Sequence, residues 1–241
     1  MDSAPASLAP LVRPPKQPVA AAWHTFLLLG IIAGWSGLAY FSAEAMRAAP
    51  NPSRVPMYLR TTGMEWVLTG YVVWGVRRHG GTIHELIGGR WTRVRDFFRD
   101  VGIAAVFWLG AILVLKAVAV AVGTTNGYAA LKFLLPQGRT EMALWVVMSL
   151  TAGFCEELIF RGYLQRQFAA WTGSAAAGIV LSALAFGAGH VYQSGKSTVV
   201  LFVFGLLFGG LAQWRRSLRP GMMAHAWQDT LAGLVGQLVR R

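Results

Sequence analysis

Long apolar runs alternate with short arginine-rich or proline-rich segments along the chain, and this pattern predicts helices that cross a membrane. About 20 apolar residues span the hydrocarbon core of a bilayer as a helix. Seven runs approach this length, at about 23–41, 57–76, 101–122, 142–160, 168–190, 198–214 and 221–238. Seven spans leave Arg240 and Arg241 on the outer side, against the positive-inside rule, and an eighth short or re-entrant segment near 128–135 would repair this. We therefore expect an all-α protein, a polytopic transmembrane helical bundle with seven to eight spans.

The same pattern divides the chain into three parts. Residues 1–22 are rich in proline and alanine, and prolines at positions 9, 14, 15 and 18 exclude a continuous helix. We expect a disordered N-terminal tail there. Residues 23–139 hold the N-terminal membrane spans, and residues 140–239 hold the remaining ones.

A basic segment separates the second and third spans, near residues 77–100. Its arginines are Arg77, Arg78, Arg90, Arg93, Arg95 and Arg99. Cytoplasmic loops carry an excess of positive charge, so this segment and the N-terminus are expected on the cytoplasmic side. Trp91, Val94, Phe97 and Phe98 recur there at helical spacing, which predicts an amphipathic helix lying on the lipid headgroups.

Composition supports a membrane protein. The 241 residues are 55% hydrophobic and 13% charged, whereas a soluble domain carries about 25% charged residues. A net charge of +12 would suggest a nucleic-acid partner in a soluble chain. Here the arginines lie mainly between apolar runs, so we expect lipid and no nucleic acid as partner, and a multi-pass location in a bacterial inner membrane. A single cysteine, Cys155, excludes an internal disulfide and a cysteine-rich zinc site.

Three charged residues interrupt the end of the fourth apolar run. They are Glu156, Glu157 and Arg161. An ionised side chain at the bilayer centre costs about 2.5–3.5 kcal/mol on insertion scales, so an intramembrane site is the default hypothesis. Glu157 and Arg161 lie four residues apart on one helical face and can pair. Glu156 is turned about 100° from Glu157 and can point into a cavity, free to act on water.

Two further polar clusters follow on other predicted helices. His190 ends the fifth run, four residues after Phe186, and His225 and Asp229 lie four apart in the seventh. The fourth and fifth helices run antiparallel, so sequence alone does not bring their ends to one depth. Either these ends are broken or a cavity reaches inward. A carboxylate and histidines in a water-accessible membrane cavity suit hydrolysis, and they suit a proton relay as well.

The three clusters, in this order and spacing, resemble the motifs of the CPBP intramembrane proteases. These are the type II CaaX prenyl endopeptidases and bacteriocin-processing proteins, also called the Abi domain. The resemblance covers about residues 140–232 and implies that residues 140–239 form a catalytic membrane domain with an intramembrane active-site cavity.

The resemblance also implies roles for the six polar residues. Glu156 would activate a water molecule, and His190 would hold that water or a metal ion. Glu157 and Arg161 would form a structural pair. His225 and Asp229 would stabilise the oxyanion. The family's last motif usually ends in asparagine, and an ionised aspartate would repel an oxyanion, so Asp229 must be protonated, bind metal or orient His225.

A divalent metal is a further expectation. Zinc is the natural ion for histidine and carboxylate ligands, which would here be Glu156, His190 and His225. The chain is thus interpreted as a metal- or glutamate-dependent endopeptidase, a hydrolase acting on a membrane-associated peptide or protein. Three alternatives stay open: a cysteine protease using Cys155, a non-enzymatic membrane partner or immunity protein, and a proton-coupled transporter.

Overall fold

The computed structural model describes residues 17–124 and 132–238, and every regular element in those ranges is helical. The elements are α1 (Ala22–Ala48), α2 (Val55–Arg78), α3 (Ile83–Ile87), α4 (Val94–Ala121), α6 (Gly138–Glu156), the π-helix η1 (Glu157–Leu164), α7 (Gln165–Thr172), α8 (Ala175–Gly189), α9 (Gly195–Arg215) and α10 (Arg219–Leu238). The expected all-α class is confirmed for these ranges. Residues 1–16 of the expected tail and residues 128–131 of the segment near 128–135 lie outside them.

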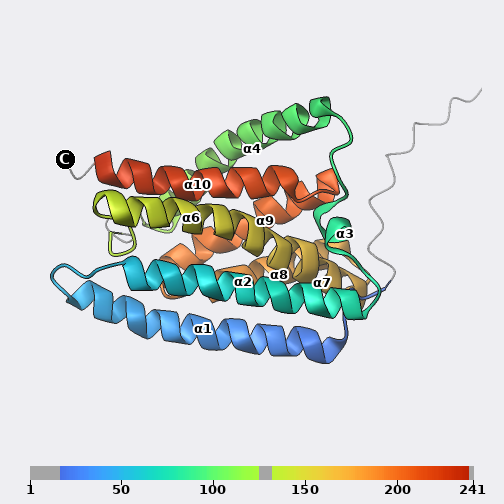
Figure 1. Ribbon diagram of the computed structural model, residues 1–241, viewed down its shortest axis with the longest axis horizontal. Helices are drawn as coiled ribbons and strands as arrows, with labels where there is room; N and C mark the ends of the chain where they lie inside the picture. The colour runs from blue at the N-terminus through green and yellow to red at the C-terminus, as the bar shows by residue number, and fades with distance from the viewer. Residues whose placement is uncertain (1–16, 125–131, 239–241) are drawn as a thin grey trace, which may run out of the picture.

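Four helices in the described ranges are long and apolar enough to cross a membrane. They are Ala22–Ala48, Val94–Ala121, the continuous rod Gly138–Thr172 and Gly195–Arg215. The expectation of seven to eight spans is therefore too high by this measure. Helix α8 is apolar but has only 15 residues, and polar side chains inside α2 and α10 lower their mean hydropathy. These three helices nevertheless lie within the same bundle (Figure 1).

The bundle is built around the rod formed by α6, η1 and α7. Helices α2 and α10 pack against α6, and Figure 1 shows α1, α2, α6 and α10 extended side by side. Helices α8 and α9 pack against each other and contact η1, while α4 packs against α9 and α10. The main apolar core lies where these helices surround η1 and includes Leu158, Tyr163, Phe186 and Phe208.

Close helix contacts depend on glycine at two positions. A Cβ on Gly153 of α6 would lie 2.7 Å from the carbonyl oxygen of Met222 and 2.8 Å from Ala226, both in α10. A Cβ on Gly205 of α9 would lie 2.8 Å from Ala183 of α8. Small residues at such crossings let two backbones approach closely. These contacts set the spacing of the helices that carry the candidate site.

The expected fifth span, 168–190, is not one helix. Helix α7 ends at Thr172, Gly173 adopts a left-handed conformation with φ +67°, and Ser174 begins α8 by accepting a hydrogen bond from the Ala177 amide. Glycine adopts positive φ without steric cost, and serine is a preferred N-cap. The chain therefore reverses inside the segment that the apolar pattern predicted as a single span.

Two smaller expectations about the N-terminal half are corrected. The disordered tail does not reach residue 22, because Gln167 accepts hydrogen bonds from the Val19 and Ala20 amides and donates one to the Ala20 carbonyl. The basic segment forms no separate amphipathic helix around its aromatic residues. Instead α4 already begins at Val94, so its exposed apolar face continues directly into the long apolar helix.

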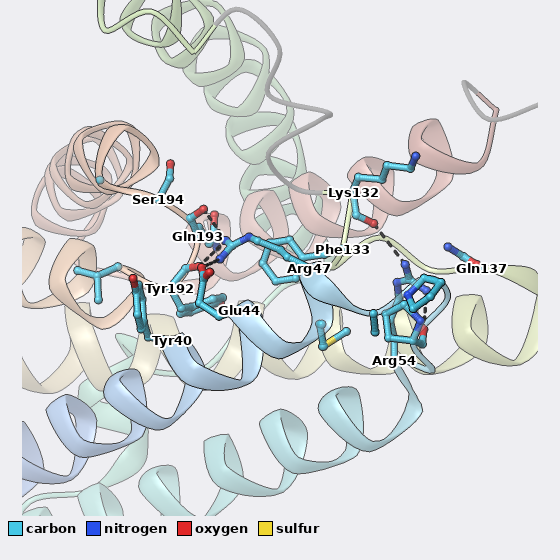
Figure 2. A pocket seen from close by; sticks show the side chains of 16 residues that line it. Tyr40, Glu44, Arg47, Arg54, Lys132, Phe133, Gln137, Tyr192, Gln193 and Ser194 are labelled. Atoms are coloured by element: carbon cyan, nitrogen blue, oxygen red, sulfur yellow. Dashed lines mark hydrogen bonds and ion pairs between the residues drawn. The ribbon is translucent and has the colours of Figure 1, made fainter.

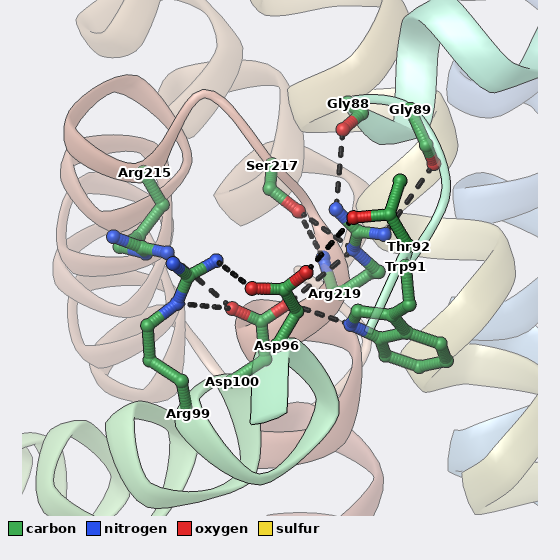
Figure 3. Close-up of polar contacts among 10 residues, drawn as sticks. All are labelled: Gly88, Gly89, Trp91, Thr92, Asp96, Arg99, Asp100, Arg215, Ser217 and Arg219. Atoms are coloured by element: carbon green, nitrogen blue, oxygen red, sulfur yellow. Dashed lines mark hydrogen bonds and ion pairs between the residues drawn. The ribbon is translucent and has the colours of Figure 1, made fainter. Parts of the chain in front are cut away.

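A buried carboxylate, Asp100, joins α4 to the turn between α9 and α10 (Figure 3). Its side chain is 1% exposed and lies 3.3 Å from Arg219 Nε, 3.4 Å from Arg215 Nη2 and 3.9 Å from Arg99 Nε. Trp91 Nε1–H donates a further hydrogen bond of 2.9 Å. We call these five residues the Asp100 cluster. It fixes the start of α10, which carries two of the expected site residues.

Candidate active site

The central rod changes its helical geometry at the candidate site. Glu156 is the last residue of α6, and Glu157 begins the eight-residue π-helix η1, all of whose residues are buried. Short π-helical stretches inside α-helices are rare and occur frequently at functional sites. The two neighbouring carboxylates therefore stand at a local change in backbone register.

Glu157 and Arg161 form an ion pair inside the protein. Arg161 Nη1 lies 3.0 Å from Glu157 Oε1, and both side chains are 1% exposed. The guanidinium lies against three phenylalanine rings, at 4.5 Å from the Phe186 centroid and at 5.6 and 5.7 Å from those of Phe208 and Phe204. Aromatic faces attract a cation, most strongly where water is excluded. The pair thus fixes η1 against α8 and α9.

The Glu157 carboxylate also orients His225 of α10. His225 Nδ1 donates a 3.0 Å hydrogen bond to Glu157 Oε1, because an ionised carboxylate can only accept. The opposite ring nitrogen, Nε2, then lies 3.6 Å from Glu156 Oε2 and 3.6 Å from Asp229 Oδ2. A buried carboxylate behind a histidine holds the ring in one orientation, as in catalytic triads.

His190 is oriented in the same way by the backbone of α8. Its Nδ1–H donates a 2.8 Å hydrogen bond to the Phe186 carbonyl, since a carbonyl oxygen can only accept. The free nitrogen Nε2 lies 3.7 Å from Glu156 Oε1. Phe186 and His190, four residues apart, are thus joined by a hydrogen bond that directs the histidine towards Glu156.

Glu156 stands between the two histidines. Each of its oxygens lies 3.6–3.7 Å from one imidazole Nε2. These separations are too long for direct hydrogen bonds, but one water molecule can contact both atoms of such a pair. The Glu156 side chain is 16% exposed and that of Asp229 is 36% exposed, whereas Glu157 is buried. The carboxylate that is not paired with arginine is the one that solvent reaches.

The helix reversal brings these groups to one depth. The rod continues beyond Glu156 to Thr172, and α8 returns from Ala175 to Gly189 over a similar number of residues. His190 therefore arrives next to Glu156 although the two helices run antiparallel. All six residues singled out in the sequence lie in one cluster: Glu156, Glu157, Arg161, His190, His225 and Asp229.

The donor set suits zinc chemically, but its arrangement does not converge on one point. In the described ranges, no group of three or more His, Cys, Asp or Glu side chains is placed to hold a metal ion. Glu156 faces the two histidines with different oxygens. We therefore derive no step through a metal, and the zinc site on Glu156, His190 and His225 stays a prediction.

Two residues near the cluster, Glu65 and Tyr192, were not identified as site residues by the sequence. Glu65 of α2 interacts electrostatically with Glu156 and Asp229. Tyr192 follows His190, and their rings lie 5.8 Å apart. Burial raises the pKa of Tyr192, and the charges of Glu156, Glu65 and Asp229 raise it further, so its hydroxyl stays a neutral donor. The one sequence signal for Glu65 was that a carboxylate interrupts the second apolar run. Nothing in the pattern of apolar and polar residues distinguished Tyr192.

A cavity of about 680 Å³ lies at the segment that directly follows His190, and none of the six clustered residues lines it (Figure 2). One wall is the segment after α8, including Tyr192 and Gln193, and other walls include Arg47, Arg54 and Phe133. Figure 2 shows Arg47 reaching across the cavity to the backbone carbonyls of Tyr192 and Gln193, at 2.7 and 2.9 Å. Its volume lies in the range of ligand-binding pockets.

Cys155 does not resemble a catalytic nucleophile. Its side chain is completely buried between α2 and α6, next to Thr69. Reactive cysteines are partly exposed and lie in electropositive surroundings, whereas Cys155 has Glu65 and Glu156 as its charged neighbours. The environment of this thiol is that of a small apolar core residue.

Comparison with known proteins places the C-terminal part of the chain. Residues 138–231 match the family model described as type II CAAX prenyl endopeptidase, Rce1-like. No curated protein and no solved structure matches the chain. The match begins at the first residue of α6, ends within α10 and contains all six clustered residues. With its four apolar helices, the protein is an integral membrane protein. This match over residues 138–231 supports the resemblance of the chain to the CPBP intramembrane proteases.

Proposed function

We propose that this protein is an intramembrane endopeptidase in which Glu156 activates water. The observation that carries the proposal is the position of Glu156, whose two oxygens each face the Nε2 atom of a differently oriented histidine at 3.6–3.7 Å. A carboxylate within reach of a bound water is a general base, and such catalysis contributes about 10²- to 10⁴-fold. The family match supports the reaction class.

In the proposed first step, water lies between Glu156 Oε1 and His190 Nε2. Glu156 accepts one proton from this water, and the water oxygen forms a bond to the carbonyl carbon of the peptide. The π electrons of the carbonyl move to its oxygen, which becomes an oxyanion. Protonated His225, held by Glu157, would donate a hydrogen bond from its Nε2–H to this oxyanion. Preorganised donors of this kind are usually the largest single catalytic contribution.

In the second step the tetrahedral intermediate collapses. The carbon–nitrogen bond breaks, and its electron pair goes to the nitrogen, which takes the proton held by Glu156. The products are a new carboxyl group and a new amine, and Glu156 returns to its ionised form. In this scheme Arg161 balances the charge of Glu157 and contacts no reacting atom.

The proposed substrate is a peptide or protein at the membrane. The family description favours a prenylated CAAX tail, and the cavity next to Tyr192 offers space for the chain flanking the scissile bond. A zinc ion, if bound by Glu156, His190 and His225, would polarise the carbonyl as a Lewis acid. Metal analysis of the purified protein distinguishes the zinc-dependent mechanism from the metal-free one. A stoichiometric metal in the wild-type protein that is absent from the His190→Ala variant would favour the zinc-dependent mechanism.

Glu156→Gln tests the proposal. This variant keeps the shape of the side chain and removes the base, so we expect hydrolysis to fall by about 10²- to 10⁴-fold with an unchanged melting temperature. The assay uses quenched fluorescent peptides in detergent micelles, one set ending in a farnesylated CAAX sequence and one set of unprenylated membrane peptides. Glu85→Gln, in the exposed helix α3 away from the cavity, is the matched control, because the glutamine oxygen can still accept from the Thr82 amide. Full activity of Glu156→Gln would contradict the mechanism.

A further inference from the structure

Glu65 has a buried carboxyl group, and the mechanism proposed above gives it no role. It lies in α2, its residue surface is 7% exposed, and its Oε2 atom is buried without a hydrogen-bond partner in the described ranges. It interacts electrostatically with Glu156 and Asp229, two residues of the candidate site. Besides Glu156, Glu157 and Asp229, a fourth carboxyl group therefore approaches the site from a helix outside the family match.

The packing of α2 on α6 explains this position. Trp66 of α2 stacks on Phe154 of α6 with ring centroids 5.8 Å apart, and Thr69 lies next to Cys155. Phe154 and Cys155 directly precede Glu156, so this face of α2 lies at the level of the candidate site. Tyr192, which follows α8, is influenced by Glu65 as well as by Glu156 and Asp229.

The neighbours of Glu65 do not satisfy it. Ionised Glu156 can only accept hydrogen bonds, and so can ionised Asp229. A buried polar atom without a partner costs stability, whereas an apolar group of the same shape would not. Sites that break such a local rule are typically functional ones. A hydrogen-bond donor on a bound substrate would satisfy this oxygen.

We propose that Glu65 is a substrate-binding residue of this active site, whose carboxyl group accepts a hydrogen bond from a peptide N–H beside the scissile bond. A peptide in extended form carries such donors at every residue except proline. This inference rests on the proposed function and adds a contact from the N-terminal half of the chain. Residues 138–231 alone would therefore form an incomplete substrate site.

Glu65→Met tests this inference by removing the acceptor and keeping an apolar side chain of similar length. We expect KM for the cleaved quenched peptide to rise about tenfold while kcat changes less than twofold, as for a contact made equally in ground and transition states. The melting temperature should stay the same or rise, because an unsatisfied buried group is removed. Glu65→Gln retains one acceptor oxygen and should restore most of the affinity.

Thr69→Val is the control, since Thr69 lies one turn further along α2 and is equally buried. An unchanged KM in Glu65→Met, or an equal rise in Thr69→Val, would overturn the inference. If Glu65→Met does not fold, Glu65→Asp replaces it, because the shorter side chain withdraws the acceptor and should raise KM as well. Loss of activity in Glu156→Gln with an unchanged KM in the Glu65 variants would refute this inference and leave the proposed function intact.

Discussion

Glu156 and Glu157 are neighbours in the chain with opposite environments. Glu157 is buried and contacts both Arg161 and His225, so its charge is balanced and its position is fixed. Glu156 forms no ion pair with an arginine among the described residues, and it lies between two imidazole nitrogens in the more exposed part of the cluster. Two carboxyl groups held in different surroundings can take different roles, one structural and one catalytic. The proposed roles, structural for Glu157 and catalytic for Glu156, follow from this difference in environment.

The aspartate at position 229 leads to a prediction at the same scale. Asp229 Oδ2 faces the nitrogen of His225 that would contact the oxyanion, at 3.6 Å. An ionised carboxylate there opposes a developing negative charge, whereas an amide can donate to it. We therefore expect Asp229→Asn to raise kcat, by up to about tenfold, without changing the melting temperature. Initial rates at saturating quenched peptide measure this.

Asp229→Leu serves as the companion variant. It removes the negative charge but supplies no donor, so its kcat should lie below that of Asp229→Asn. A tenfold or larger fall of kcat in Asp229→Asn would instead show that the carboxyl group itself takes part, as an acid or as a metal ligand. That result would favour the other roles considered for this residue.

The residues of the cluster were predictable to different degrees. Pairs four apart, such as Glu157 with Arg161, lie on one helical face in any helix, so the sequence predicts their contact. His190 and His225 were placed by the resemblance of their motifs, and the structure brings both next to Glu156. Glu65 could not be predicted, because a single carboxylate in a weakly apolar run looks the same whether it faces lipid headgroups or a site.

At the scale of elements, the continuous rod of α6, η1 and α7 explains how the site is assembled. The apolar pattern separated this rod from the next helix at the wrong place, because residues 168–190 are apolar on both sides of Gly173. The reversal depends on one positive φ and one serine cap, which average hydropathy does not register. The π-helical register of η1 likewise leaves no periodic signature in the sequence.

The contact between α6 and α10 predicts the effect of a single methyl group. A Cβ on Gly153 would lie 2.7–2.8 Å from Met222 and Ala226, so Gly153→Ala must push the two helices apart. Glu156 lies on one of these helices and His225 on the other. A misplacement of about 1 Å can cost about 10²-fold in rate, and we expect a fall in kcat/KM of that order.

Gly210→Ala is the matched control, because nothing lies within 4 Å of a Cβ at that helical position. It should keep full activity. Circular dichroism should show the same helix content for both variants and for the wild-type protein. Equal activity of Gly153→Ala and the wild-type protein would mean that the separation of α6 and α10 does not control the site.

For the whole molecule, the arginines define one end of the bundle. Arg219 contacts the carbonyl of Gly88, and Arg166 contacts the carbonyls of Glu85 and Leu86, so the basic segment and the start of α10 lie together. The Asp100 cluster lies at the same end (Figure 3). The loop between α1 and α2 lies at the opposite end (Figure 1). The positive-inside rule predicts that the arginine-rich end faces the cytoplasm.

Cysteine labelling can determine this orientation, because the single native cysteine, Cys155, is completely buried. Thr92→Cys places an exposed thiol at the arginine-rich end, and Ser53→Cys places one between α1 and α2. In intact bacterial cells, a membrane-impermeant maleimide should label Ser53→Cys and leave Thr92→Cys unlabelled until the membrane is permeabilised. The wild-type protein, unlabelled in both conditions, is the control. Labelling of Thr92→Cys alone in intact cells would reverse the orientation and place the N-terminal end of α1 outside, because it shares the end of the bundle that carries the basic segment.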